Sequence, residues 1–334
     1  MSDGVEGRTS KVESQRPGPP IGGGESLRPS TLDLRPDLPP DLSPNQRAWR
    51  RFLGNRPAVV SLAFISLLLL AVVLWPTAAA NQVSDLQFHQ PGTGHVLGTD
   101  VHGRDLLARM IAGARISLLV GAVGAGVSLV IGVLWGAIAG YVGGRTDSLL
   151  MRVVDILYCL PNIVFVMVLI TTLEKFLKEW LDNVKFGMSA RLLLLFAGLG
   201  AISWLTMARI VRGQVLSLRT RQFVDASRAL GASHTRILLR HILPNVTGII
   251  IVYLALTVPA IILYESFLSF LGLGIQPPMA SWGSLIAEGA SQLNPIRIYW
   301  WLIVFPAAMM VTTLLALNFL GDGLRDAFDP RAQT

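Results

Sequence analysis

The sequence contains few cysteines, few charges and none of the short motifs that mark a catalytic centre. Its single cysteine, Cys159, excludes an intrachain disulfide and a zinc site built from clustered cysteines. Because Cys159 falls within an apolar stretch, we expect it to be a small packing residue. Charged residues make up only 15% of the 334 residues, whereas 52% are hydrophobic. This balance excludes an ordinary soluble domain.

The sequence has no G-x-x-x-x-G-K-[ST] motif, so it lacks the loop with which a P-loop ATPase holds phosphate. H-E-x-x-H, G-x-S-x-G and paired catalytic carboxylates inside an apolar stretch are also absent. His89, His95 and His102 share one loop, but the turn residues around them provide no fixed geometry for a metal. We therefore predict no enzymatic activity, no metal site and no cofactor.

What the chain does contain is a series of apolar blocks of about 20 residues, the length that a helix needs to cross about 30 Å of hydrocarbon. We therefore predict an all-α membrane protein. Pro161, Pro259 and Pro306 each fall within a block and predict kinks. The six predicted transmembrane helices are Ala58–Ala80, Ile116–Ala139, Val153–Leu173, Leu192–Ile210, Ile249–Leu271 and Trp300–Leu320.

Small residues recur at every fourth position of the second block. Residues at this spacing lie along one stripe of a helix, and small side chains let a second helix approach closely in lipid. The stripe predicts tight helix packing and says little about function. It consists of Gly124, Ser128, Gly132, Gly136 and Gly140.

The segments outside the blocks predict the topology. Residues 1–44 are rich in Pro, Gly, Ser and Arg and predict a disordered cytoplasmic tail, and residues 45–56 predict an amphipathic helix on the lipid headgroups. Residues 57–325 form the predicted six-span domain, and 326–334 a cytoplasmic C-terminal tail. Arginines gather in the loops that are cytoplasmic when the N-terminus is inside. The net charge of +7 therefore indicates topology rather than binding to nucleic acid.

One long polar segment, residues 211–245, separates the fourth and fifth blocks. Within it, Gln222–Leu230 has good helix formers, and Gly231 interrupts the pattern. Ser233 is placed to cap a second helix, which Pro244 is predicted to stop. The segment therefore predicts a short helix, a bend and a second helix that leads into the fifth block.

The first short helix has an apolar face made of Phe223, Ala226 and Leu230. An exposed helix with a modest apolar face suits docking in a groove of a soluble partner. A cytoplasmic loop without a partner is the alternative.

Four segments together resemble one family. Asp225-Ala226-Ser227, followed by Gly231 and Leu243-Pro244, resembles the coupling loop of dipeptide/oligopeptide/nickel-type ABC importer permeases. Asp225 stands where that family usually has Glu, and Ser227 where it has a second Ala, so a carboxylate is kept. The other three segments are similar to the second, C-type permease subunit of the family and are His95–Asp105, Leu268–Gly283 and Asn318–Asp326.

The resemblance covers about residues 46–331 and implies a type I ABC importer permease-like bundle with a cytoplasmic coupling helix. Such a subunit forms half of a translocation pathway, here expected for peptides, and docks an ATPase subunit through the 222–244 loop. The implied partners are a second homologous permease, two ATP-binding subunits and an extracytoplasmic solute-binding protein, in the bacterial inner membrane. The implied coupling residues are Asp225, Ala226, Ser227, Gly231, Leu243 and Pro244.

Two carboxylates, Asp155 and Glu265, fall within apolar blocks, where charge is costly in lipid. For Asp155, close to Arg152, we expect an ion pair or a contact with a helix end. Glu265 leaves two alternatives open, which are lining the translocation path and hydrogen bonding to a neighbouring helix. A deep carboxylate also leaves open an ion-coupled secondary transporter, although the sequence shows no convincing internal repeat of the kind such proteins contain.

Overall fold

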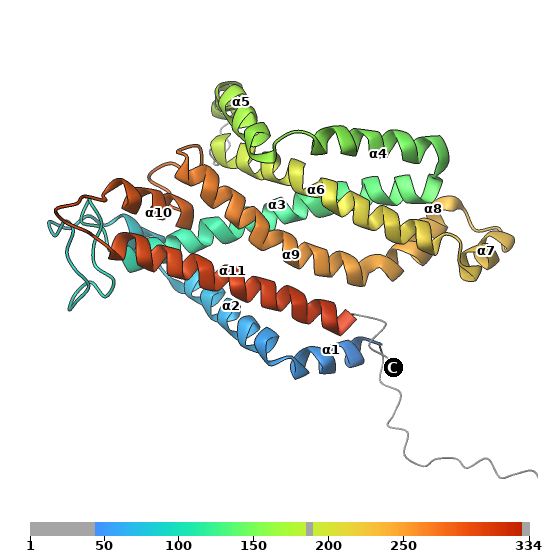
Figure 1. Cartoon of the computed structure of the whole chain (residues 1–334), viewed down its shortest axis with the longest axis horizontal. Coiled ribbons are helices and arrows are strands. Elements are labelled where there is room, and N and C mark those ends of the chain that lie inside the picture. Colours follow the sequence, from blue (N-terminus) through green and yellow to red (C-terminus); the bar gives the residue numbers. More distant parts are fainter. Residues whose placement is uncertain (1–43, 185–189, 329–334) are drawn as a thin grey trace, which may run out of the picture. The chain divides into compact units, whose positions relative to one another are not determined.

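The computed structural model describes residues 44–184 and 190–328, which form an array of helices (Figure 1). Within these ranges, β pairing is limited to two isolated bridges, Val83–Arg104 and Thr99–Asp105. Predictions about the tails at 1–43 and 329–334 lie outside the described residues. In chain order the elements are α1 (Pro44–Gly54), α2 (Arg56–Leu74), a 3-10 helix η1 (Thr77–Asn81), α3 (Leu106–Val142), α4 (Gly144–Tyr158), α5 (Asn162–Val184), α6 (Ala190–Leu218), α7 (Gln222–Ala229), α8 (His234–Arg236), a π-helix η2 (Ile237–Ile242), α9 (Leu243–Phe270), α10 (Trp282–Ser291) and α11 (Trp301–Phe328).

Five of the described helices are long and apolar enough to cross a membrane, and a sixth span results if α4 and α5 are counted as one bent pair. The prediction of an all-α membrane protein is therefore confirmed. The helix ends differ from the predicted ones where local capping decides them. The first span stops at Leu74 instead of Ala80 because Pro76 favours an extended conformation for Trp75. The second begins ten residues early, at Leu106, because the Asp105 side chain accepts a hydrogen bond from the Ala108 N–H.

The third predicted span is broken rather than kinked. α4 and α5 are bent by 83° across the residues that include Pro161. Proline disfavours the helical conformation of the residue before it and lacks an N–H for the helix ladder. Cys159 ends α4 and its side chain is exposed, so the prediction that it packs in the core is wrong. By contrast, α9 and α11 continue as helices through Pro259 and Pro306.

The small-residue stripe of α3 lies against α6. A Cβ atom at Gly132 would lie 2.6 Å from the Cβ of Met207, and one at Gly140 would lie 2.8 Å from the carbonyl oxygen of Arg212. At Gly136 it would overlap the carbonyl oxygen of Ala208. The backbones therefore touch directly, and the predicted tight packing is confirmed.

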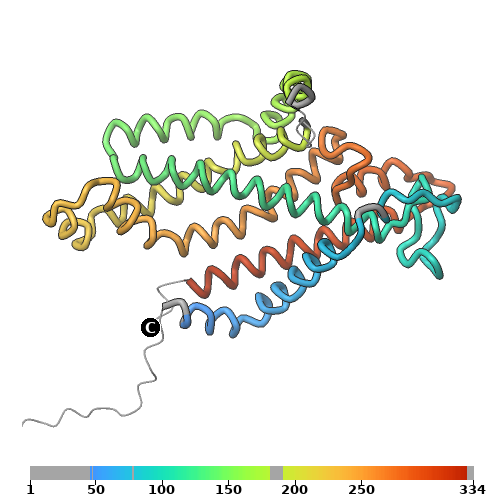
Figure 2. Tube along the Cα trace, turned by 180° about the vertical axis from the view of Figure 1, so that it is seen from behind, coloured from blue at the N-terminus to red at the C-terminus, as the bar shows by residue number. Residues whose placement is uncertain are grey.

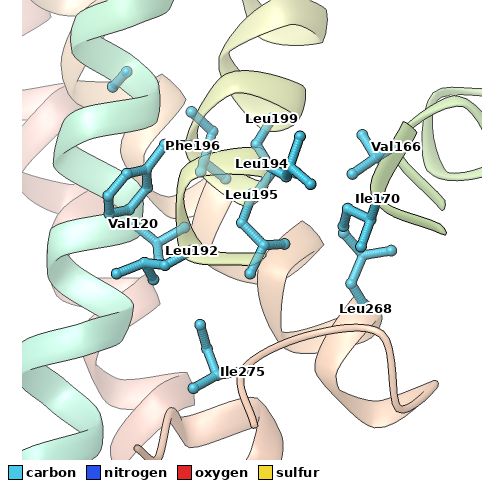
Figure 3. Packing of buried hydrophobic residues seen from close by; sticks show 12 residues of the cluster. Val120, Val166, Ile170, Leu192, Leu194, Leu195, Phe196, Leu199, Leu268 and Ile275 are labelled. Atoms are coloured by element: carbon cyan, nitrogen blue, oxygen red, sulfur yellow. The ribbon is translucent and has the colours of Figure 1, made fainter. Parts of the chain in front are cut away.

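The remaining helices pack around this pair. α9 contacts both α3 and α6, and α5 closes one apolar cluster, in which Val166 and Ile170 face Leu195 of α6 and Leu268 of α9 (Figure 3). α1 and α2 lie alongside α11, as the view from behind shows (Figure 2). Phe52 of α1 is buried against this contact rather than facing outward with Trp49.

The close contact of α3 and α6 predicts that Gly136→Ala destabilises the chain. The added methyl group must displace backbone, so we expect a loss of about 2 kcal/mol in spite of the better helix propensity of alanine. Thermal unfolding in detergent measures this. Gly126→Ala is the matched control, because a Cβ at Gly126 meets no atom within 4 Å. Equal melting temperatures for the two variants would contradict the packing described here.

Candidate functional site

α7, in the segment between α6 and α9, is largely exposed and is anchored to the bundle by one buried side chain. Val224 of α7 is fully buried and packs in a cluster with Ile237 and Ile242 of the π-helix. The neighbouring Phe223 and Leu230 remain 40% and 88% exposed. The predicted apolar face therefore points away from the bundle. Sequence reasoning missed Val224, although an apolar β-branched residue within a largely polar segment gave a signal for a buried anchor.

The chain reverses direction after α7 at Gly231. Its φ of +80° lies in the left-handed region that glycine adopts without steric cost. The N–H of Gly231 donates to the carbonyl of Arg228, and that of Ala232 to the carbonyl of Ser227. Ser233 then caps α8 by accepting a hydrogen bond from the N–H of Arg236. These contacts fix the bend that the sequence predicts.

Pro244 does not stop the second short helix, so that prediction is wrong. The helix passes from α8 through the π-helix into α9, and His234–Phe270 forms one continuous helical span. Pro244 lies in the first turn of α9, directly after the π-helical turn, so the helix continues through it. Leu243 packs at the edge of the cluster around Val224, whereas Pro244 is exposed.

Of the predicted coupling residues, Asp225, Ala226 and Gly231 are exposed on α7 and its turn, and Ser227 is partly buried. Asp225 pairs with Arg228 over 3.0 Å, one turn further along. Beside them lies a cavity of about 840 Å³, lined by residues that include Tyr141, Arg219, Asp225, Arg228 and His234.

Two contacts tie this region to the end of α3. The hydroxyl of Tyr141 lies 2.9 Å from Nδ1 of His234, and the Arg219 guanidinium donates to the carbonyls of Gly140 and Tyr141. The arrangement offers an apolar face rimmed by arginines, which suits a partner with a groove and acidic edges.

At the other end of the molecule, a buried ion-pair cluster joins the loop before α3 to α10. Asp100 accepts hydrogen bonds from the side chains of Arg104 and Arg109, over 2.7 and 2.8 Å. Arg109 also donates to Glu288 of α10. Nearby, His95 lies 2.9 Å from a carboxylate oxygen of Asp105.

Asp100 stays charged in spite of its burial. Burial alone would raise the pKa of its carboxyl, but the Arg104 N–H and the guanidinium groups of Arg109 and Arg104 outweigh that effect. The pKa of Asp100 therefore lies below its usual value. This cluster explains why so many charges of the His95–Asp105 segment can lie beside an apolar bundle.

Glu265 is fully enclosed between α3, α9 and the start of α10. One of its oxygens accepts from the Ser269 hydroxyl over 2.6 Å, and the other from the Ser117 hydroxyl over 3.4 Å. Ser117 in turn accepts from the N–H of Trp282, the first residue of α10. Glu265 therefore makes the hydrogen bonds to a neighbouring helix that one of the two alternatives predicts. Its role in lining the translocation path stays a prediction.

Sequence reasoning did not identify α10 as a helix. Its signal was the pair Ser281 and Ser284, which form reciprocal capping hydrogen bonds at its start. Asp155 does form an ion pair, but with Arg209 of α6 rather than with Arg152. Arg152 lies three residues away on the same helix, whereas Arg209 comes from a separate helix that only the fold brings close.

Comparison with known proteins identifies the relatives of this chain. Residues 132–334 match the family model described as binding-protein-dependent transport system inner membrane component, and residues 43–91 match the N-terminal TM domain of oligopeptide transport permease C. The oligopeptide transport system permease protein OppC of Haemophilus influenzae is 45% identical over 292 residues, 86% of this chain and 88% of the relative. The dipeptide transport system permease protein DppC of Bacillus subtilis is 41% identical, over 87% of each chain.

Among solved structures, a chain of the MetNI methionine ABC transporter in an inward-facing conformation matches with a TM-score of 0.51 and 16% identity. The match covers 65% of this chain and 95% of the other. At this identity the likeness concerns the fold alone.

The ion-pair cluster predicts that Asp100→Asn weakens the loop before α3. Removal of one buried charge leaves Arg109 without a full partner, so we expect a loss of about 3 kcal/mol in the free energy of unfolding. Asp85→Asn is the control, since Asp85 is an exposed carboxylate in the same loop.

Because folding lowers the pKa of Asp100, the contribution of its charge to the free energy of unfolding is complete above about pH 3.8, the ordinary pKa of the group. This contribution declines as the pH falls further. The difference in melting temperature between wild type and Asp100→Asn should therefore shrink below that pH, and a constant difference would contradict this assignment.

Proposed function

Because the chain belongs to the family of binding-protein-dependent transport system inner membrane components, we propose that it is the C-type permease of an ATP-driven peptide importer, with α7 as the element that docks the ATPase. The observation that carries the docking proposal is the contrast within α7. Val224 fixes the helix to the bundle, while Phe223 and Leu230 are left facing outward. Phe223, Ala226 and Leu230 are exposed together, and an exposed helix with such an apolar face suits docking in a groove.

The peptide substrate is inferred from the relatives, whose names specify oligopeptide and dipeptide transport. The chain has no phosphate-binding loop of its own, so ATP hydrolysis belongs to separate subunits. The partners we propose are a second homologous permease, two ATP-binding subunits and an extracytoplasmic solute-binding protein. The ion-coupled alternative is set aside because it conflicts with membership of a binding-protein-dependent family.

The same proposal sets the orientation. α7 and the bend at Gly231 must face the cytoplasm, where ATP is supplied, and the cluster of Asp100 must then face outward. The N-terminus and the turn at Gly143 lie on the cytoplasmic side in this orientation, in the inner membrane. The arginines that surround α7 support it, since positive charge is enriched in cytoplasmic loops.

The docking proposal predicts that Asp225→Arg and Gly231→Pro uncouple the transporter. The first reverses a charge on the exposed side of α7, and the second forbids the left-handed turn. We expect peptide uptake into vesicles that hold the full complex to fall about tenfold or more, as for other interface anchors, together with loss of the copurified ATPase or of its response to peptide. Asp85→Arg, an exposed charge reversal at the opposite end, should leave uptake unchanged. Normal uptake by both α7 variants would refute docking through this element.

The orientation predicts which side of the membrane labels a cysteine at position 233. In a Cys159→Ser background, Ser233→Cys should resist a membrane-impermeant maleimide in intact cells and react after the cells are opened. Thr93→Cys, in the exposed loop at the opposite end, should label in intact cells and serves as the control. The reverse pattern would place α7 outside and end the coupling proposal with it.

A further inference from the structure

One side of the bundle, made by α4 and α6, is polar and has no cover within the described part of the chain. α4 packs on α3 and α6 at the edge of the helix array (Figure 1). The exposed positions of α6 between Leu205 and Leu218 follow a helical stripe with no large apolar side chain. A second polar stripe follows α4 beside it. We call the two stripes the polar face, which consists of Ser148, Arg152, Asp155 and Cys159 of α4 and Thr206, Arg209, Gly213 and Ser217 of α6.

The exposed side of α2 has a different composition. The exposed positions of α2 include Leu67, Leu70 and Val73, all large and apolar. α4 itself carries an apolar exposed stripe next to its polar one, with Leu149 and Ile156 more than 60% exposed. The chain therefore distinguishes its surfaces by composition, and the polar face is not built for hydrocarbon.

An ion pair lies in the middle of the polar face. Arg209 donates to Asp155 over 2.6 Å, and its guanidinium lies 4.0 Å from the ring centre of Tyr158. The Tyr158 hydroxyl lies 2.5 Å from that of Thr206. Although they are paired, the side chains of Asp155 and Arg209 remain 64% and 45% exposed. Both side chains are thus accessible to a charged group of a ligand without a change in the fold.

The pair lies away from the helix ends that face the cytoplasm in the proposed orientation. Arg209 is nine residues before the end of α6 at Leu218, about 13 Å along the helix axis. Its partner Asp155 is eleven residues into α4, about 16 Å from the start of that helix. In the proposed orientation the pair therefore lies more than two helical turns from the cytoplasmic end of α6. An exposed ion pair within a span needs water or a polar partner.

We propose that the polar face lines the water-filled path of the importer and that Asp155 and Arg209 contact charged groups of the peptide in transit. This inference rests on the proposed function, since it presumes a peptide substrate. A peptide carries an ammonium and a carboxylate, and the pair presents one charge of each sign. The contacts are weak because both groups are solvated and already paired, which suits a path that must release what it binds. Glu265 is enclosed and takes no part in this face.

Water accessibility tests the position of the face. In a Cys159→Ser background, single cysteines at Thr206, Gly213 and Ser217 are treated with the charged reagent MTSET in the complex held in lipid nanodiscs. A side chain built at Gly213 meets no atom within 4 Å, so Gly213→Cys leaves packing intact, whereas Thr206→Cys removes the hydroxyl contact with Tyr158. The controls are Val73→Cys, exposed on α2, and Ala208→Cys, buried on α6 itself.

We expect the three polar-face cysteines to react at least about tenfold faster than both controls, as charged reagents reach thiols only through water. Reaction as slow as at Val73→Cys would show that lipid or the second permease covers the face and would overturn the proposal. The labelling needs no ATP and no docking. It can therefore fail while the Asp225→Arg test succeeds, or the reverse, which separates this inference from the proposed function.

The second experiment tests contact with the substrate. Uptake of three tripeptides, one neutral, one basic and one acidic, is measured at saturating binding protein and expressed relative to wild type for each peptide, which cancels the selectivity of the binding protein. Arg209→Gln should lower uptake of the acidic tripeptide about threefold more than that of the basic one, the size expected of an exposed charge contact, and Asp155→Asn should do the opposite. Arg212→Gln removes the partner of Asp147 and is the matched control, expected to affect all three peptides equally. An equal effect of Arg209→Gln and Asp155→Asn on all three peptides would reduce the pair to a structural contact and refute the second half of the proposal.

Discussion

The close approach of α3 and α6 is the contact on which the rest of the structure depends. Lipid provides no hydrophobic drive for two apolar helices to associate, so van der Waals contact between backbones has to supply it. The glycines of α3 make that contact possible over several turns, from Gly124 to Gly140. α4, α5 and α9 then pack on the surfaces that this pair presents. The positions of α7 and of the polar face follow from it, because α7 is the next helix after α6 and the polar face includes the exposed side of α6.

Polar contacts hold the parts that glycine packing does not reach. Asp100 and Arg109 connect the loop before α3 to α10. Glu265 connects α9 to the first residue of α10 through the hydroxyl of Ser117. Asp147 and Arg212 join the first turn of α4 to the second half of α6. A buried charge that loses its partner is costly. Because slippage of a helix by one turn would separate these pairs, each pair favours one arrangement of its helices.

The sequence predicted what depends on local pattern. The apolar blocks, the glycine stripe, the bend at Gly231 and the cap at Ser233 are all readable from neighbouring residues. The errors came where distant segments decide. The ion pair expected of Asp155 is present, but its partner is Arg209, which is close only after folding, and not the neighbouring Arg152. Pro161 was read as a kink and Pro244 as a stop, whereas the surrounding packing made the first a break of 83° and let the second continue in a helix. Val224 was overlooked because burial of one residue in a polar loop depends on what packs over it.

The continuous helix from His234 to Phe270 connects the two ends of the molecule. Its 37 residues extend about 55 Å, from the bend that follows α7 to the turn that follows Glu265. The π-helical turn Ile237–Ile242 comes just before Pro244, and the helix continues through both. A tilt of only about 5° at one end of a rod of this length displaces the other by about 5 Å. The position of the bend after α7 and that of the turn after Glu265 are thereby linked through a single element of the backbone.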